Sequence, residues 1–170
     1  MKTIKILLFI VTTSLIISSC GGDDTSNGDQ QQSDQYTVEV NNIELTDNYT
    51  WTTSNIGEEG NMILDIKNTS DETIYFKIKF LAKSDNADTQ ELELCLGNCY
   101  NGIIVNNIYP SDTPFQLEQG QTSPHGSCHI KNNDNRNGAV WFKFKLFQTD
   151  QNGNELTNKK SITFTYEFQP

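Results

Sequence analysis

The stretch Leu64–Phe80, LDIKNTSDETIYFKIKF, decides the fold of this chain of 170 residues. Its second half alternates apolar residues with tyrosine and lysine, and the apolar positions are Ile74, Phe76, Ile78 and Phe80. Successive side chains of a strand point to opposite faces, so this pattern predicts a strand with one buried face. The polar run NTSDE in the middle is typical of a turn. The stretch therefore predicts two strands joined by a short turn.

The same period of two returns along the rest of the chain. It predicts one strand over each of the segments 37–45, 62–66, 140–146 and 162–168. No stretch has a helical period over three turns. About seven or eight short strands over this length predict an all-β fold, an immunoglobulin-like antiparallel β-sandwich. A small barrel is the alternative.

Longer phrases of the sequence resemble a known type of module. Residues 64–80 resemble the second and third strands of immunoglobulin-like modules, and PFQLEQGQTS (114–123) resembles the segment that precedes one of their later strands. Together with CLGNCY (95–100) and NGAVWFKFKLF (137–147), they are similar to β-sandwich modules of secreted and surface proteins of Bacteroidota. The resemblance implies a fold and no catalytic residues. Such modules usually have an apolar residue near position 128, where this chain has Cys128.

The first twenty residues, MKTIKILLFIVTTSLIISSC, have the features of an export signal. Lys2 and Lys5 precede an apolar run that is too short to span a bilayer, which takes about 20 apolar residues. The run therefore predicts a signal peptide over 1–19. Residues 17–20, ISSC, resemble the bacterial lipobox, in which the cysteine is acylated and becomes the mature N-terminus. This resemblance implies that Cys20 is lipidated and that its acyl chains anchor the protein to a membrane.

The next segment predicts a flexible tether over 20–35. Residues 21–35, GGDDTSNGDQQQSDQ, contain no apolar side chain that could offset the entropy of ordering. The early acidic pair Asp23-Asp24 resembles the acidic segment of surface-exported lipoproteins of Bacteroidota. It implies an outer-membrane lipoprotein exposed at the surface, with the periplasmic face as the alternative. Residues 36–170 are enough for one domain.

Charge limits the partners of the chain. The formal net charge is −10, and Lys2 and Lys5 would leave with the signal peptide. Such a chain lacks the basic clusters that bind nucleic acid or anionic lipid surfaces. The predicted partners are the membrane, through the lipid anchor, and a protein or a glycan.

We find no catalytic signature, and the chain is not expected to be an enzyme or to need a cofactor. Neither histidine follows a nucleophile elbow. Glu91 and Glu93 alternate with leucines, which predicts a solvated strand face rather than a catalytic pair.

The cysteines of the stretch ELELCLGNCY (91–100) carry the clearest candidate chemistry. In an extended strand Cys95 and Cys99 would lie about 13 Å apart, too far for a disulfide, which needs Cα atoms within about 7 Å. The intervening Leu96-Gly97-Asn98 can form a turn that brings them together across a hairpin. An oxidising envelope permits the bond. The sequence therefore predicts a Cys95–Cys99 disulfide.

A metal site is the alternative for the same residues. Its ligands would be Cys95 and Cys99 with His125, Cys128 or His129, whose spacing is compatible with zinc. The redox environment favours the disulfide. Cys128 is then either a small buried apolar residue or a partner in a different pairing.

A glycan-binding module is a further alternative. Four aromatic residues could form a platform on which a sugar stacks, and they are Tyr49, Trp51, Tyr100 and Tyr109. Aromatic residues of a sandwich more often close the ends of its core.

Overall fold

The computed structural model describes residues 35–133 and 138–170. The chain divides into two compact units, Met1–Gln32 and Ser33–Pro170, and the described residues belong to the second. The predicted signal peptide (1–19), the predicted lipidation site Cys20 and residues 21–34 of the predicted tether lie outside the described residues.

The described residues form thirteen strands and one short 3-10 helix, η1. The elements are β1 (Tyr36–Val40), β2 (Ile43–Glu44), β3 (Tyr49–Thr53), η1 (Gly57–Gly60), β4 (Asn61–Ile63), β5 (Asp65–Asn68), β6 (Ile74–Lys83), β7 (Leu92–Leu96), β8 (Asn98–Asn101), β9 (Ile108–Tyr109), β10 (Phe115–Leu117), β11 (Cys128–Asn132), β12 (Val140–Thr149) and β13 (Ser161–Phe168).

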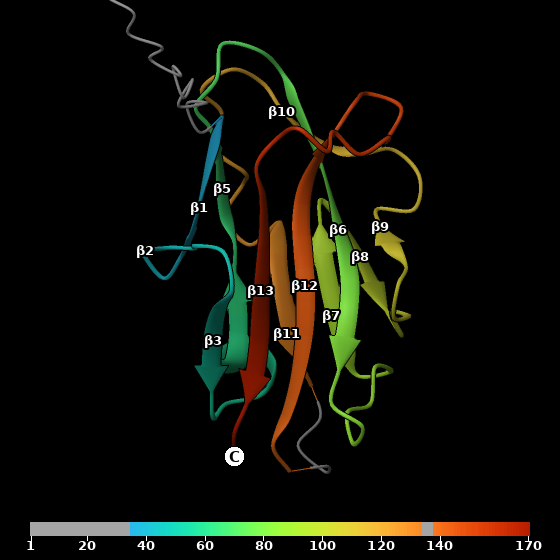
Figure 1. The fold of residues 1–170 in the computed structure, drawn as a ribbon. Coiled ribbons are helices and arrows are strands. Elements are labelled where there is room, and N and C mark those ends of the chain that lie inside the picture. Colours follow the sequence, from blue (N-terminus) through green and yellow to red (C-terminus); the bar gives the residue numbers. More distant parts are fainter. Residues whose placement is uncertain (1–34, 134–137) are drawn as a thin grey trace, which may run out of the picture. The chain divides into compact units, whose positions relative to one another are not determined.

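The strands form three sheets in two layers. The 6-stranded sheet has the order β10-β6-β12-β13-β3, and β9 also pairs with β6. The 4-stranded sheet has the order β4-β11-β7-β8, and the 3-stranded sheet the order β2-β1-β5. Figure 1 shows β7 and β11 behind β6 and β12, so the 4-stranded sheet covers one face of the 6-stranded sheet. The predicted all-β, immunoglobulin-like β-sandwich is confirmed.

The core lies between these layers and includes the apolar positions that the period of two predicts to be buried. Phe80 of β6, Phe144 of β12 and Phe164 of β13 are fully buried. Their rings stack in series, with centroids 5.2 Å apart from Phe80 to Phe144 and 5.7 Å apart from Phe144 to Phe164. Alternation along the three longest strands therefore builds the centre of the sandwich.

The prediction of a single strand over residues 37–45 is wrong. The segment forms a hairpin, β1 and β2, in which Val40 lies opposite Ile43. Asn41 and Asn42 form the turn with φ angles of 52° and 63°. Asparagine tolerates this left-handed conformation, and two such residues in succession make the turn that suits a two-residue hairpin. The apolar positions change phase at the turn, from Val38 and Val40 to Ile43 and Leu45, and the prediction of one strand overlooks this shift.

One strand pair is parallel. β13 pairs with β3 from Phe164 opposite Tyr49 to Phe168 opposite Thr53, whereas the other pairs between named strands are antiparallel. Alternation with a period of two predicts a strand and its buried face, but it does not predict whether the neighbouring strand is parallel or antiparallel.

Candidate functional site

The hairpin of β7 and β8 is closed by a covalent bond. Cys95 and Cys99 lie directly opposite each other and form a disulfide, with their Cα atoms 4.0 Å apart. Gly97 makes the turn with a φ of 74°, and its N–H donates to the Ser127 carbonyl at 3.0 Å. The turn predicted at Leu96-Gly97-Asn98 thus gives the two cysteines the short separation that a disulfide needs.

His129 extends this pair into a row across three strands. In the register of the 4-stranded sheet, His129 of β11 is opposite Cys95 of β7, which is opposite Cys99 of β8. A ring nitrogen of His129 and the two sulfurs all lie within 4.8 Å of one another. Cys95 is buried, His129 is 9% exposed and Cys99 is exposed. We call His129, Cys95 and Cys99 the sulfur row.

A charged row lies beside the sulfur row on the same face of the sheet. It consists of Lys131 and Glu93, which are opposite each other in the register. Lys131 Nζ lies 3.1 Å from Glu93 Oε1 and 2.8 Å from Glu58 Oε1. The hydrogen bond with Glu58 raises the pKa of Lys131, and Glu93 raises it further.

Glu93 joins the two rows. His129 Nε2 lies 2.9 Å from Glu93 Oε1, and this hydrogen bond, together with Lys131, holds the pKa of the Glu93 carboxyl below its usual value in spite of its burial. The predicted solvated face is wrong for Glu93, since its side chain is only 21% exposed. The residue is on the outer face, as predicted, but long side chains from β11 cover it.

The ring of His129 is fixed from both sides. Its Nδ1 lies 2.7 Å from the Gly126 carbonyl oxygen, which can only accept, so Nδ1 donates. Nε2 lies on the other side, 2.9 Å from the Glu93 carboxylate. The ring is therefore held with Nε2 toward the charged row.

The two remaining candidate ligands lie elsewhere. Cys128 precedes His129 in β11, so its side chain points to the opposite face, where it is a free thiol buried in the core. Burial raises the pKa of this thiol. His125 Nδ1 lies 3.6 Å from Asp65 Oδ1, and its side chain is 79% exposed. Of the predicted set, the structure brings together Cys95, Cys99 and His129.

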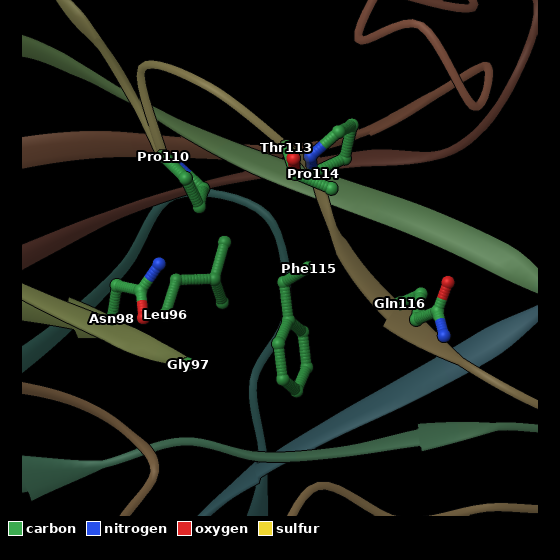
Figure 2. Close-up of a pocket in the computed structure, with 8 residues that line it drawn as sticks. All are labelled: Leu96, Gly97, Asn98, Pro110, Thr113, Pro114, Phe115 and Gln116. Atoms are coloured by element: carbon green, nitrogen blue, oxygen red, sulfur yellow. The ribbon is translucent and has the colours of Figure 1, made fainter.

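A pocket of about 410 Å³ lies beside the tip of the same hairpin. Its lining comes from the hairpin and from the segment that leads into β10, and the residues are Leu96, Gly97, Asn98, Pro110, Thr113, Pro114, Phe115 and Gln116. Figure 2 shows Leu96 and Phe115 at its centre, with the amide groups of Asn98 and Gln116 on opposite sides of them. None of these lining residues is ionisable.

Two contacts hold the walls of the pocket. Lys77 of β6 is 7% exposed, and its Nζ donates to the Asp112 carbonyl at 3.0 Å. This bond ties the segment before β10 to the 6-stranded sheet. At the opposite wall, a Cβ on Gly97 would lie 2.9 Å from Cδ2 of Phe115. The hairpin tip therefore fits the Phe115 ring only because residue 97 has no side chain.

The edge next to the pocket is open and partly apolar. Within the described residues β8 pairs with β7 alone, so its other side is the edge of the 4-stranded sheet. The chain continues from β8 into a segment with two exposed isoleucines, Ile104 at 61% and Ile108 at 40%. An open strand edge next to apolar side chains is a surface to which an extended chain can add.

The four aromatic residues do not form one platform. Tyr49 and Trp51 lie on β3, at one edge of the 6-stranded sheet, and pack against the core. Tyr100 of β8 instead packs against Tyr109 of β9, with ring centroids 5.1 Å apart, and β9 pairs with β6 on the other side of that sheet. The structure thus separates the predicted sugar-stacking set into two pairs that serve the core.

The sequence reasoning did not identify Glu93, Lys131 or the pocket. A signal exists for the two charged residues: the patterns Glu93-x-Cys95 and His129-x-Lys131 put each pair on one face of its strand, and pairing of the two strands joins them. No signal exists for the pocket, because its two walls meet only through the fold.

No protein-family model matches the chain, and no curated protein matches it. Among solved structures, the N-terminal domain of PorA is similar with 19% identity and a TM-score of 0.48, over 79% of this chain and 97% of that chain. The ASH/PapD-like domain 7 of human CEP192 is similar with 11% identity and a TM-score of 0.43, over 92% of this chain and 96% of that chain. At these values neither similarity indicates a function for this chain.

No helix among residues 35–133 and 138–170 has both the length and the apolar character that crossing a membrane would take.

Proposed function

We propose that this chain is a lipid-anchored, non-catalytic binding module of the bacterial outer membrane that captures an extended segment of a partner protein. The observation that carries the proposal is the pocket between Leu96 and Phe115, together with the open edge of β8 beside it. Anchoring at Cys20, exposure at the cell surface and the absence of catalysis are parts of the same proposal.

The pocket supports binding rather than catalysis. General acid–base chemistry needs an ionisable side chain within hydrogen-bond reach of the substrate, and none of the described residues that line this pocket has one. Apolar walls with two amide groups suit an apolar side chain whose neighbouring peptide groups bond to Asn98 and Gln116.

The open strand supports an extended protein segment as the ligand. A segment that pairs with β8 would obtain its affinity from main-chain hydrogen bonds and its specificity from a side chain in the pocket. The exposed Ile104 and Ile108 would be covered by the same partner. A glycan finds less support, since Trp51, Tyr100 and Tyr109 of the predicted stacking set pack against other aromatic rings of the domain.

The test is site-specific photocrosslinking in cells that produce the full chain. A photoreactive phenylalanine analogue replaces Gln116, which is exposed at the pocket, and as a control Thr52, which is exposed on β3. We expect a discrete protein adduct from position 116 and none of that mass from position 52. A second substitution, Thr113→Trp, should fill the pocket and abolish the adduct. The absence of an adduct at 116, or the same adduct at 52, would contradict the proposal.

A further inference from the structure

The sulfur row has the types of side chain that bind zinc, but its two sulfurs are joined in a disulfide. Thiolate sulfur and imidazole nitrogen are the ligands that zinc prefers, and Cys95, Cys99 and His129 present three such atoms within 4.8 Å. We propose that the row is a redox-dependent zinc site, which is closed while Cys95 and Cys99 form a disulfide and binds zinc after the disulfide is reduced. The inference does not depend on the pocket or on its partner.

The sheet already holds the ligands at suitable places. The three residues are neighbours in one register row of β11, β7 and β8, so no strand has to move to bring them together. Tetrahedral zinc at about 2.3 Å from each sulfur places the two sulfurs about 3.8 Å apart. Residues directly opposite each other in an antiparallel pair have Cβ atoms about 4.5–5.5 Å apart. Rotation of the two side chains is therefore enough to open the pair to the metal.

The surroundings of His129 are those of a metal ligand. Histidines that bind metals usually donate their other ring N–H to a carbonyl or a carboxylate, which fixes the ring. Here Nδ1 donates to the Gly126 carbonyl at 2.7 Å, so Nε2 is the atom that would bind zinc, in exchange for its contact with Glu93. The hydrogen bond to Gly126 does not involve the cysteines and is independent of their redox state.

Glu93 lies beside the sulfur row, outside the group of three ligand atoms that are within 4.8 Å of one another. Its Oε1 lies 2.9 Å from His129 Nε2, and it precedes Cys95 by two residues on the same face of β7. Two thiolates and a neutral imidazole around zinc leave no net charge, and the Lys131 ammonium, 3.1 Å from Glu93, offsets the charge of the neighbouring carboxylate. The exposed Cys99 gives both the reductant and the metal access to the row.

The chemistry is balanced by a dithiol reductant. The S–S bond breaks as the two cysteines take up two electrons and two protons, and the dithiol becomes a disulfide. Zinc then takes the place of the two thiol protons, which leave to the solvent, and the imidazole of His129 binds it through a nitrogen lone pair. In the reverse direction, the disulfide of the oxidised dithiol takes back the two electrons, the Cys95–Cys99 bond forms again, and the metal is released.

The experiment is zinc titration of the full chain, oxidised and after reduction with a dithiol that is removed under anaerobic conditions. Native mass spectrometry gives the stoichiometry, a chelator competition gives the affinity, and near-UV circular dichroism reports whether the fold is kept. We expect one zinc per reduced chain and none per oxidised chain. With cobalt in place of zinc, a thiolate-to-metal charge-transfer band should appear in the reduced chain alone.

Matched variants identify the ligands. Loss of a residue that only hydrogen-bonds to a metal ligand already costs about 10-fold or more in metal affinity. His129→Ala removes a ligand itself and should therefore weaken zinc binding by at least about 10-fold, and Cys99→Ala should abolish it. His125→Ala and Cys128→Ala, which change the other histidine and the free thiol, should leave the affinity unchanged. Absence of zinc from the reduced chain, retention of zinc by Cys99→Ala, or loss of the fold on reduction would each overturn the proposal.

Discussion

Gly97 holds the tip of the β7–β8 hairpin in a conformation that other residues adopt only with difficulty. Its φ is 74°, and a Cβ there would lie 2.9 Å from the Phe115 ring. A left-handed L-residue costs about 1–2 kcal/mol, and crowding of a packed ring adds about 1–3 kcal/mol. We expect Gly97→Ala to lower the free energy of unfolding by the sum of both effects, as measured by urea denaturation.

Gly120→Ala is the matched control for this prediction. Gly120 has a φ of 70°, and a Cβ there would have no neighbour within 4 Å. Gly120→Ala should therefore lower the free energy of unfolding only by the cost of the left-handed backbone, about 1–2 kcal/mol. Equal losses in the two variants would show that Phe115 does not depend on the glycine.

Tyr166 contributes a buried hydrogen bond whose effect depends on pH. Its hydroxyl donates to the Gly60 carbonyl at 2.8 Å, and burial raises its pKa to about 12. Since the folded pKa lies above the unfolded value, the stability from the neutral hydroxyl is complete below about pH 10 and is lost as the pH rises from about 10 to 12. Tyr166→Phe should cost about 1–3 kcal/mol at neutral pH because Gly60 loses its partner.

The comparison across pH separates Tyr166 from the other tyrosines. In denaturation curves taken between pH 8 and 12, the difference in stability between the wild type and Tyr166→Phe should shrink as the pH rises. A constant difference would mean that Tyr166 ionises equally well in the folded and unfolded chains.

At the scale of the strands, the disulfide links β8 covalently to β7, the one strand with which β8 pairs within the described residues. In the loop-entropy view, a ring of this size stabilises the fold by about 2 kcal/mol. The double variant Cys95→Ala/Cys99→Ala should lose this amount and stay folded, since β7 keeps its pairing with β11. Addition of a dithiol should lower the stability of the wild type similarly, in metal-free buffer, and leave the double variant unchanged. A wild type that is insensitive to the dithiol would contradict this account.

The sequence predicts strands well where the alternation is long. It does not predict the features that depend on which strands pair with each other, such as strand direction. β6, β12 and β13 follow directly from apolar residues at every second position. The hairpin at Asn41 and Asn42 is missed because the prediction takes two short alternating segments, shifted in phase by one residue, for one long strand. The direction of β3 depends on the strand it joins, and β13 lies more than 100 residues further along the chain.

The candidate site divides in the same way. The pairing of Cys95 with Cys99 could be predicted because a turn of three residues joins them. The place of His129 could not be predicted, since the register of β11 against β7 is set by burial of Leu94 and Ile130 on the other face. The same register excludes Cys128 from the row, because adjacent residues of a strand point to opposite faces.

At the scale of the whole molecule, the proposed anchor makes the location of the protein depend on one sulfur atom. Cys20→Ser should remove the acylation site, and the protein should move from the membrane fraction to the soluble fraction of lysed cells. Fractionation followed by immunoblotting measures this, with Cys128→Ser as the control that changes a cysteine of the folded domain. Membrane retention of Cys20→Ser at the wild-type level would contradict lipid anchoring.

The position of β13 determines when the domain can finish folding. β13 follows every other described strand in the chain, yet it lies inside the 6-stranded sheet, between β12 and β3. While residues 161–168 are still in the ribosome, β3 lacks the one strand with which it pairs within the described residues, and Phe144 lacks the ring of Phe164. Pairing across such a long separation is also slow. A chain whose export begins before residues 161–168 are synthesised would therefore reach the translocation machinery with its largest sheet still open, which is the state in which a polypeptide can be threaded through a narrow channel.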